Sequence, residues 1–195
     1  MLLYIFGGAF KSGKPSDFGP EFIMNKNIIL VMVNYRLGAL GFLSTGDSVI
    51  PGNMAMKDQT MAMKWTRNNI FNFGGDSSRI TIHGHSSGSA CVHLHTLSPL
   101  SRGMGIAAYL IVLQPCTSTF QSSLCNTDYF DRAIMQSGLG VNPQFFWDRD
   151  NAMGIARAFA QRLNCSTDSS NLLKECLQSK TASELVFAAE DVHVG

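Results

Sequence analysis

The residues in this 195-residue sequence best suited to covalent chemistry lie around Ser86, in the pattern Gly84-His85-Ser86-Ser87-Gly88. A serine between two glycines at this spacing can stand at the apex of a sharp turn, because residues without side chains let the flanking elements approach closely. Its hydroxyl is then accessible to a base and can attack a carbonyl carbon. A glycine- and serine-rich loop without a catalytic role also fits these five residues, so the pattern alone is a weak indication.

The flanking sequence favours the catalytic interpretation. A short β-branched run, Arg79-Ile80-Thr81-Ile82, predicts a strand before the turn. Small residues after the turn predict a helix over 87–97, which Ser98-Pro99 would stop. Strand, turn and helix in this order are what a nucleophile elbow requires. Ser86 is therefore the candidate nucleophile.

A second glycine-rich turn could assist it. The apolar run Leu2–Phe6 predicts a buried strand, and Gly7-Gly8-Ala9-Phe10 follows it. A turn of small residues can aim backbone N–H groups at a developing oxyanion, because no side chains block the approach. An ordinary glycine turn is the simpler alternative.

Other segments indicate how such a site would be held. Apolar runs predict strands over 28–34 and 130–136, and helical spacing predicts helices over 54–68, 148–163, 169–178 and 182–189. The methionines of the first of these helices, with Ala55, Ala62 and Trp65, are expected to pack in the core. Strands separated by helices predict an α/β protein with a mostly parallel sheet covered by helices on both faces.

Composition excludes some function classes. The net charge is +1 and no basic run occurs, so nothing indicates a nucleic-acid partner. The strand pattern begins at Leu2 without a charged region before it, so we expect no signal peptide here. Neither end has a terminating pattern, and we expect a chain truncated at both ends.

The glycine-rich segments and several others together resemble type-B carboxylesterases, a branch of the α/β-hydrolase fold that includes cholinesterases and insect esterases. The resemblance covers nearly the whole chain. The segments that carry it are, in chain order, Gly7-Gly8-Ala9-Phe10, the run 34–43, Pro51-Gly52-Asn53, Lys57-Asp58-Gln59, Phe73-Gly74-Gly75-Asp76, the turn at Ser86, Leu97-Ser98-Pro99 and the run 133–138.

The resemblance implies hydrolysis of a small-molecule carboxylic ester through an acyl-enzyme, without metal or organic cofactor. It makes Ser86 the nucleophile and the backbone N–H groups of Gly8, Ala9 and Ser87 the oxyanion hole. Two positions depart from common family residues: Phe6, where many relatives have histidine or tyrosine, and His85, where glutamate is usual. Neither needs a particular side chain for the chemistry, so these departures concern the choice of substrate.

The resemblance also implies a disulfide between Cys165 and Cys176. The alternative is that these cysteines are two unrelated thiols. A disulfide would place the parent protein in an oxidising compartment, secreted or in the lumen of the endoplasmic reticulum. Asn164-Cys165-Ser166 is formally a glycosylation sequon, but cysteine in the middle makes it a poor one.

The base and the acid of a catalytic triad are not evident. By the family's spacing, its glutamate and histidine fall beyond Gly195, so we expect residues 1–195 alone to have little or no activity. His83, His85 and His93 are poorly placed to replace the missing histidine.

Two other interpretations remain open. A compact esterase could use Ser86 with Asp150 or Asp168 and with His193. A non-catalytic, cholinesterase-like binding or adhesion domain is the alternative from a different functional class.

We therefore expect one partial carboxylesterase domain over 1–195, with an atypical insertion at about 104–129. Relatives cross this position with about one residue, whereas this chain has 26. The apolar part, 104–113, is too short to span a membrane. A retained intron and a genuine surface insertion both explain the segment. No pattern in the sequence indicates an oligomeric state.

Overall fold

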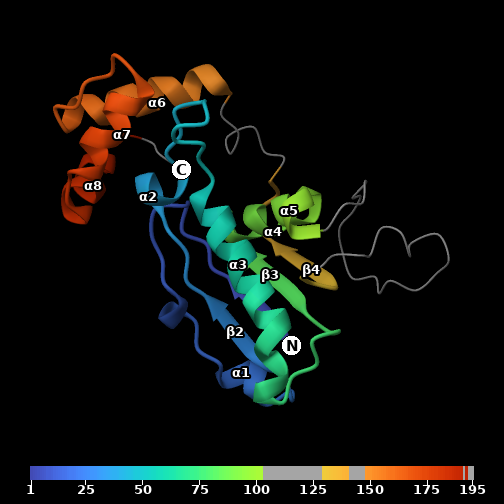
Figure 1. Ribbon diagram of the computed structural model, residues 1–195. Coiled ribbons are helices and arrows are strands. Elements are labelled where there is room, and N and C mark those ends of the chain that lie inside the picture. Colours follow the sequence, from blue (N-terminus) through green and yellow to red (C-terminus); the bar gives the residue numbers. More distant parts are fainter. Residues whose placement is uncertain (103–128, 141–147, 191, 193–195) are drawn as a thin grey trace. The chain divides into compact units, whose positions relative to one another are not determined.

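The computed structural model describes residues 1–102, 129–140, 148–190 and 192 (Figure 1). Two compact units are formed. The sheet unit comprises 1–9, 13–34 and 56–142, and the helical unit comprises 10–12, 35–55 and 143–195. Almost all of the predicted insertion at 104–129, and His193, lie outside the described residues, so the predictions made for them are not tested.

The sheet unit is built on four parallel strands in the order β2-β1-β3-β4 (Figure 1). They are β1 (Leu2–Ile5), β2 (Leu30–Val33), β3 (Thr81–His85) and β4 (Arg132–Gln136). In register, Tyr4 of β1 stands beside Met32 of β2 and beside His83 of β3. The predicted α/β class with a parallel sheet is confirmed.

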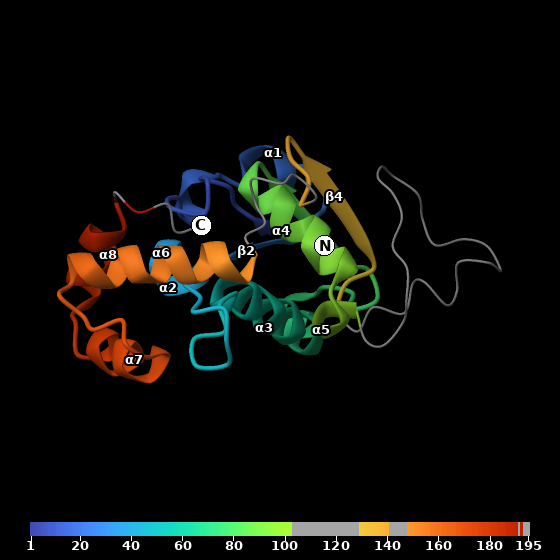
Figure 2. The ribbon, with the colours of Figure 1, turned by 90° about the horizontal axis from the view of Figure 1, so that it is seen from above.

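One face of this sheet is closely packed. Leu3 of β1 pairs in register with Ile82 of β3, and Leu3, Ile5 and Ile82 are fully buried. Helix α4 (Ser87–Leu97) contacts β1, β3 and β4, and Figure 2 shows it running next to β4. The parallel strands therefore hold the start of α4 firmly at their carboxyl ends.

Helix α3 (Met54–Asn69) lies where the sequence predicts it, but its buried face differs from the expected one. Met63 is fully buried, whereas the side chains of Met61 and Trp65 are 70% and 52% exposed. The expectation that Met61 and Trp65 pack in the core is wrong. A helical repeat of 3.6 residues places the polar Gln59 and Thr66 on the same buried face as Met63.

Several short elements of the two units were not predicted. These are η1 (Pro15–Asp17), α1 (Glu21–Met24), α2 (Gly38–Phe42), η2 (Ile70–Phe73) and α5 (Pro99–Arg102). Segments of three to five residues are too short to show a helical repeat in sequence. At α5 the proline that stops α4 also begins the next helix, as its fixed φ allows.

The helical unit contains α6 (Arg149–Arg162), α7 (Ser170–Gln178) and α8 (Ala182–Ala189), all at predicted positions (Figure 2). The residue before each helix caps it: Asp148, Ser169 and Thr181 accept hydrogen bonds from the backbone N–H three residues later. The buried apolar cluster consists of Leu43, Ala156, Phe159, Ala160, Leu163, Cys165, Leu173, Leu177, Ala188 and Val192.

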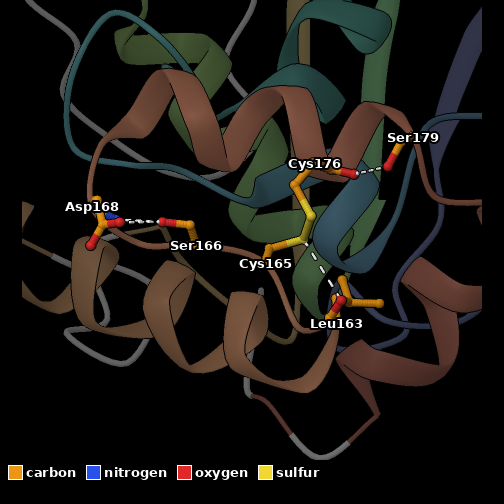
Figure 3. The surroundings of a disulfide bond; sticks show 6 residues. All are labelled: Leu163, Cys165, Ser166, Asp168, Cys176 and Ser179. Carbon is orange, nitrogen blue, oxygen red and sulfur yellow. Dashed lines mark hydrogen bonds between the residues drawn. A yellow bond between two sulfur atoms is a disulfide. The ribbon is translucent and has the colours of Figure 1, made fainter.

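A disulfide joins Cys165, just after α6, to Cys176 in α7 (Figure 3). Their Cα atoms are 5.7 Å apart, and Cys165 belongs to the buried cluster. The pairing implied by the family resemblance is therefore confirmed.

A carboxylate also ties this unit together. Asp47 accepts hydrogen bonds from Ser170 Oγ at 2.6 Å, from Thr45 Oγ1 at 2.6 Å and from the Val49 N–H at 2.9 Å. These bonds, that of Ser170 foremost, lower the pKa of Asp47 to about 2. The loop before α3 is thus fastened to the start of α7.

Across the described ranges, every helix is too short or too polar to cross a membrane.

Candidate active site

Ser86 occupies the junction between β3 and α4, in a backbone conformation that L-residues rarely adopt. Its φ is 56° and its ψ is −126°. Such a conformation costs on the order of 1–3 kcal/mol and persists only where surrounding contacts enforce it. Ser86 is the N-cap of α4, yet its side chain makes no capping hydrogen bond. The hydroxyl of this half-buried residue is therefore not committed to holding the helix.

The two glycines of the motif are required by close backbone contacts. A Cβ on Gly84 would collide with the Gly88 carbonyl and stand 2.7 Å from the Ser89 nitrogen. A Cβ on Gly88 would collide with the Ile5 carbonyl. Strand β3, helix α4 and the end of β1 thus meet where no side chain fits, and this contact forms the sharp turn at Ser86.

The turn after β1 begins directly beside Ser86. A Cβ on Gly7 would collide with the His85 carbonyl and lie 3.0 Å from Ser86 Cβ. Gly8, Ala9 and Phe10 then follow with positive φ angles of 126°, 53° and 61°. The structure therefore brings the turn that carries Gly8 and Ala9 to Ser86, and their role as an oxyanion hole stays a prediction.

Ser87, also predicted for the oxyanion hole, is the first residue of α4. Its side chain is almost completely buried, with 1% exposed. N–H groups in the first turn of a helix point toward its N-terminal end, where the helix dipole favours negative charge. An anion that forms at Ser86 would lie at this end of α4.

The two histidines on β3, His83 and His85, make contacts that do not involve the Ser86 hydroxyl. The ring of His83 packs edge-on against Tyr4, with centroids 5.1 Å apart. Burial lowers the pKa of His83, the neighbouring His85 lowers it further, and a hydrogen bond with Gln136 opposes both effects. His85 is exposed. Within the described ranges, no histidine is hydrogen-bonded to the Ser86 hydroxyl.

A buried polar network joins α4 to α3 and α5, and the sequence did not reveal it. His95 Nε2 is 2.9 Å from Gln59 Oε1, and His95 Nδ1 is 2.7 Å from Ser101 Oγ. A carbonyl oxygen only accepts, so in neutral His95 Nε2 carries the proton and Nδ1 accepts from Ser101. The Gln59 amide also donates to Cys91 Sγ.

Burial dominates the titration of this network. It lowers the pKa of His95 to about 3 and raises the pKa of the Cys91 thiol to about 12. Both groups are therefore neutral at physiological pH and serve to join α3, α4 and α5. The signal that could have revealed them is the polar Gln59, which shares a helix face with Met63.

The end of strand β4 and the residues after it are hydrogen-bonded to Ser86 and Ser89. The Ser86 N–H donates to the Gln136 carbonyl at 2.9 Å, and Ser89 Oγ donates to the Gly138 carbonyl at 2.5 Å. Ser89 was not singled out by sequence reasoning, because its partner is 49 residues away in the chain.

The residues of the compact-esterase alternative stay untested as a group. Asp168 accepts a hydrogen bond from Ser166 Oγ at 2.8 Å (Figure 3). Asp150 lies in the first turn of α6. His193 lies outside the described residues, so the structure does not show what it contacts.

Comparisons with known proteins identify the family and agree with the fold. The model of the "Carboxylesterase family" matches residues 1–194. Venom carboxylesterase-6 of Apis mellifera is 38% identical over 192 residues, which are 98% of this chain and 29% of that protein. Juvenile hormone esterase of Tribolium castaneum is also 38% identical, over 98% of this chain and 29% of its own length.

Among solved structures, juvenile hormone esterase from Manduca sexta, with OTFP covalently attached, superposes with a TM-score of 0.75. It is 28% identical, and the match covers 96% of this chain and 31% of that one. The chain thus spans about three-tenths of the length of the curated relatives named above.

Proposed function

Because this chain belongs to the carboxylesterase family, we propose that it carries the nucleophile and the oxyanion hole of a serine carboxylic ester hydrolase. The observation that supports this most strongly is the strained Ser86 at the β3–α4 turn, with the Gly7–Ala9 turn directly beside it. Strain of this kind at a serine is useful where the hydroxyl must be presented to a substrate.

In the proposed reaction, Ser86 Oγ attacks the carbonyl carbon of the ester while a general base takes its proton. The carbonyl oxygen becomes an oxyanion, which accepts hydrogen bonds from the N–H groups of Gly8, Ala9 and Ser87. The C–O bond to the alcohol then breaks, and the base returns the proton to the leaving alcohol. Water, deprotonated by the same base, releases the carboxylic acid and restores Ser86.

The base and its orienting acid are proposed to be the family's histidine and glutamate, supplied by a full-length protein from outside residues 1–195. Residues 1–195 alone would then have little or no activity, since loss of the base costs several orders of magnitude even when an oxyanion hole remains. We propose that 1–195 is a partial domain of that protein, with an insertion at about 104–129.

The proposed substrate is a small-molecule carboxylic ester. One of the relatives reported above is named a venom carboxylesterase and another a juvenile hormone esterase, so their names support the class of reaction and not one particular ester. A secreted or endoplasmic-reticulum location is proposed, because the Cys165–Cys176 disulfide requires an oxidising compartment.

The test is turnover of a simple aryl ester by the full-length protein that contains these residues. We expect hydrolysis that Ser86→Ala reduces by at least about a thousandfold. Ser78→Ala, which removes an exposed serine hydroxyl in the turn before β3, serves as the matched control and should retain full activity. A folded full-length protein that hydrolyses no ester would contradict the proposal and favour a binding or adhesion domain.

A further inference from the structure

The end of strand β4 contacts the nucleophile turn at several points. The Ser86 N–H donates to the Gln136 carbonyl at 2.9 Å. A Cβ on Gly138 would stand only 2.8 Å from the Ser86 carbonyl oxygen. Residues 136–138, here called the support segment, therefore touch both peptide groups of Ser86.

Ser89 fastens the support segment to helix α4. Its side chain is fully buried, and its Oγ donates to the Gly138 carbonyl at 2.5 Å. Ser89 lies in the first turn of α4, three residues after the nucleophile. Gly138 is thus held by the Ser89 hydroxyl of α4, and it also lies against the Ser86 carbonyl that precedes this helix.

Both ends of this connection are in unfavourable backbone conformations. Ser86 has a φ of 56°, and Ser137 within the support segment has a φ of 60°. Conformations of this kind persist only where neighbouring contacts over-determine them. A buried hydrogen bond between the two segments is the type of contact that can do so.

We propose that Ser89 is a positioning residue for the nucleophile: its hydrogen bond to Gly138 fixes the support segment, which in turn holds Ser86 in the geometry for attack. This inference rests on the proposed ester hydrolase function. Ser89 does not touch the reacting atoms, because its hydroxyl is directed to the Gly138 carbonyl. Its contribution is to the orientation of Ser86 and should affect the chemical step more than substrate binding.

The first test is Ser89→Ala in the full-length protein. We expect kcat to fall about tenfold with KM changed less than about twofold, because small displacements of reacting groups slow chemistry without weakening binding. Ser101→Ala is the matched control. It removes another fully buried hydroxyl, bonded to His95, and should lower stability while leaving kcat unchanged.

A second readout does not require activity. Hydrogen exchange of the Ser86 amide should accelerate at least about tenfold in Ser89→Ala, relative to the Ile82 amide in the adjoining strand. If Ser89→Ala does not fold, Gly138→Ala provides the same test, since its Cβ would push the support segment away from Ser86. It should also lower kcat and accelerate exchange at Ser86.

The outcomes separate this inference from the function on which it rests. An active wild type whose kcat and Ser86 exchange are unchanged in both variants would overturn the positioning role and leave the esterase proposal intact. A wild type that is inert toward esters would overturn the esterase proposal, and the positioning role with it.

Discussion

Acidification should destabilise the sheet unit through the buried His95. The pKa of this residue is lowered to about 3 by burial, while an unfolded histidine titrates near about 6.5. The stability that neutral His95 contributes is complete above the unfolded-state pKa and is lost as the pH falls from there toward the folded-state value. Protons bind the unfolded chain first and so favour unfolding.

The size of this loss of stability follows from the linkage between proton binding and unfolding. Between about pH 7.5 and 5 the folded protein keeps His95 neutral, so only the unfolded state takes up a proton, and the free energy of unfolding falls by about 2 kcal/mol. Most carboxylates titrate below this range and contribute little to the change. His83 and His93, whose pKa values are also lowered by burial, act in the same direction.

Urea denaturation at several pH values measures this effect. In His95→Gln, the fall in the free energy of unfolding between about pH 7.5 and 5 should be smaller by about 2 kcal/mol. In His93→Gln, on the same helix but only half-buried, most of this fall should remain. The NMR signals of the His95 ring in the folded wild type give an independent reading, because they should not shift over this range. A His95 signal that titrates near pH 6.5, or an unchanged pH dependence in His95→Gln, would refute the reasoning.

Two further predictions concern stability. Gly88→Ala should destabilise the protein by about 3 kcal/mol or more, because the new Cβ meets backbone atoms that cannot move aside. Gly154→Ala in α6, where nothing lies within 4 Å, should instead stabilise it by roughly 0.5–1 kcal/mol; equal urea midpoints for the two variants would contradict the packing argument. Reduction of the Cys165–Cys176 disulfide should cost about 2–3 kcal/mol, since it closes a loop with a sequence separation of 11. Thermal unfolding with and without reductant measures this loss, and an unchanged midpoint would show that the bond does not constrain the unfolded chain.

Local sequence signals were sufficient for much of the fold. Strand, turn and helix around Ser86 could be predicted because each carries its own signal within a few residues. The same holds for α7 and α8, whose capping residues Ser169 and Thr181 mark their beginnings. Parallel pairing followed from the alternation of strands and helices.

Features that depend on distant partners could not be predicted. The buried face of α3 is decided by what packs against it, so helical spacing wrongly predicts Trp65 in the core and does not predict the burial of Gln59. Gln59, one of the two partners of His95, is 36 residues away in sequence, and the partner of Ser89 is 49 residues away, so no local pattern connects them. The strained φ of Ser86 was implied by the motif, but the contacts that maintain it became visible only in three dimensions.

The measurement that tests the central claim most directly is mass-spectrometric mapping of the adduct formed when the full-length protein reacts with an alkyl fluorophosphonate. Our account predicts one stoichiometric adduct, on the Ser86 hydroxyl, which is absent in Ser86→Ala. An adduct on another residue that persists in Ser86→Ala, or no adduct on a folded full-length protein, would contradict the assignment of Ser86 as an esterase nucleophile.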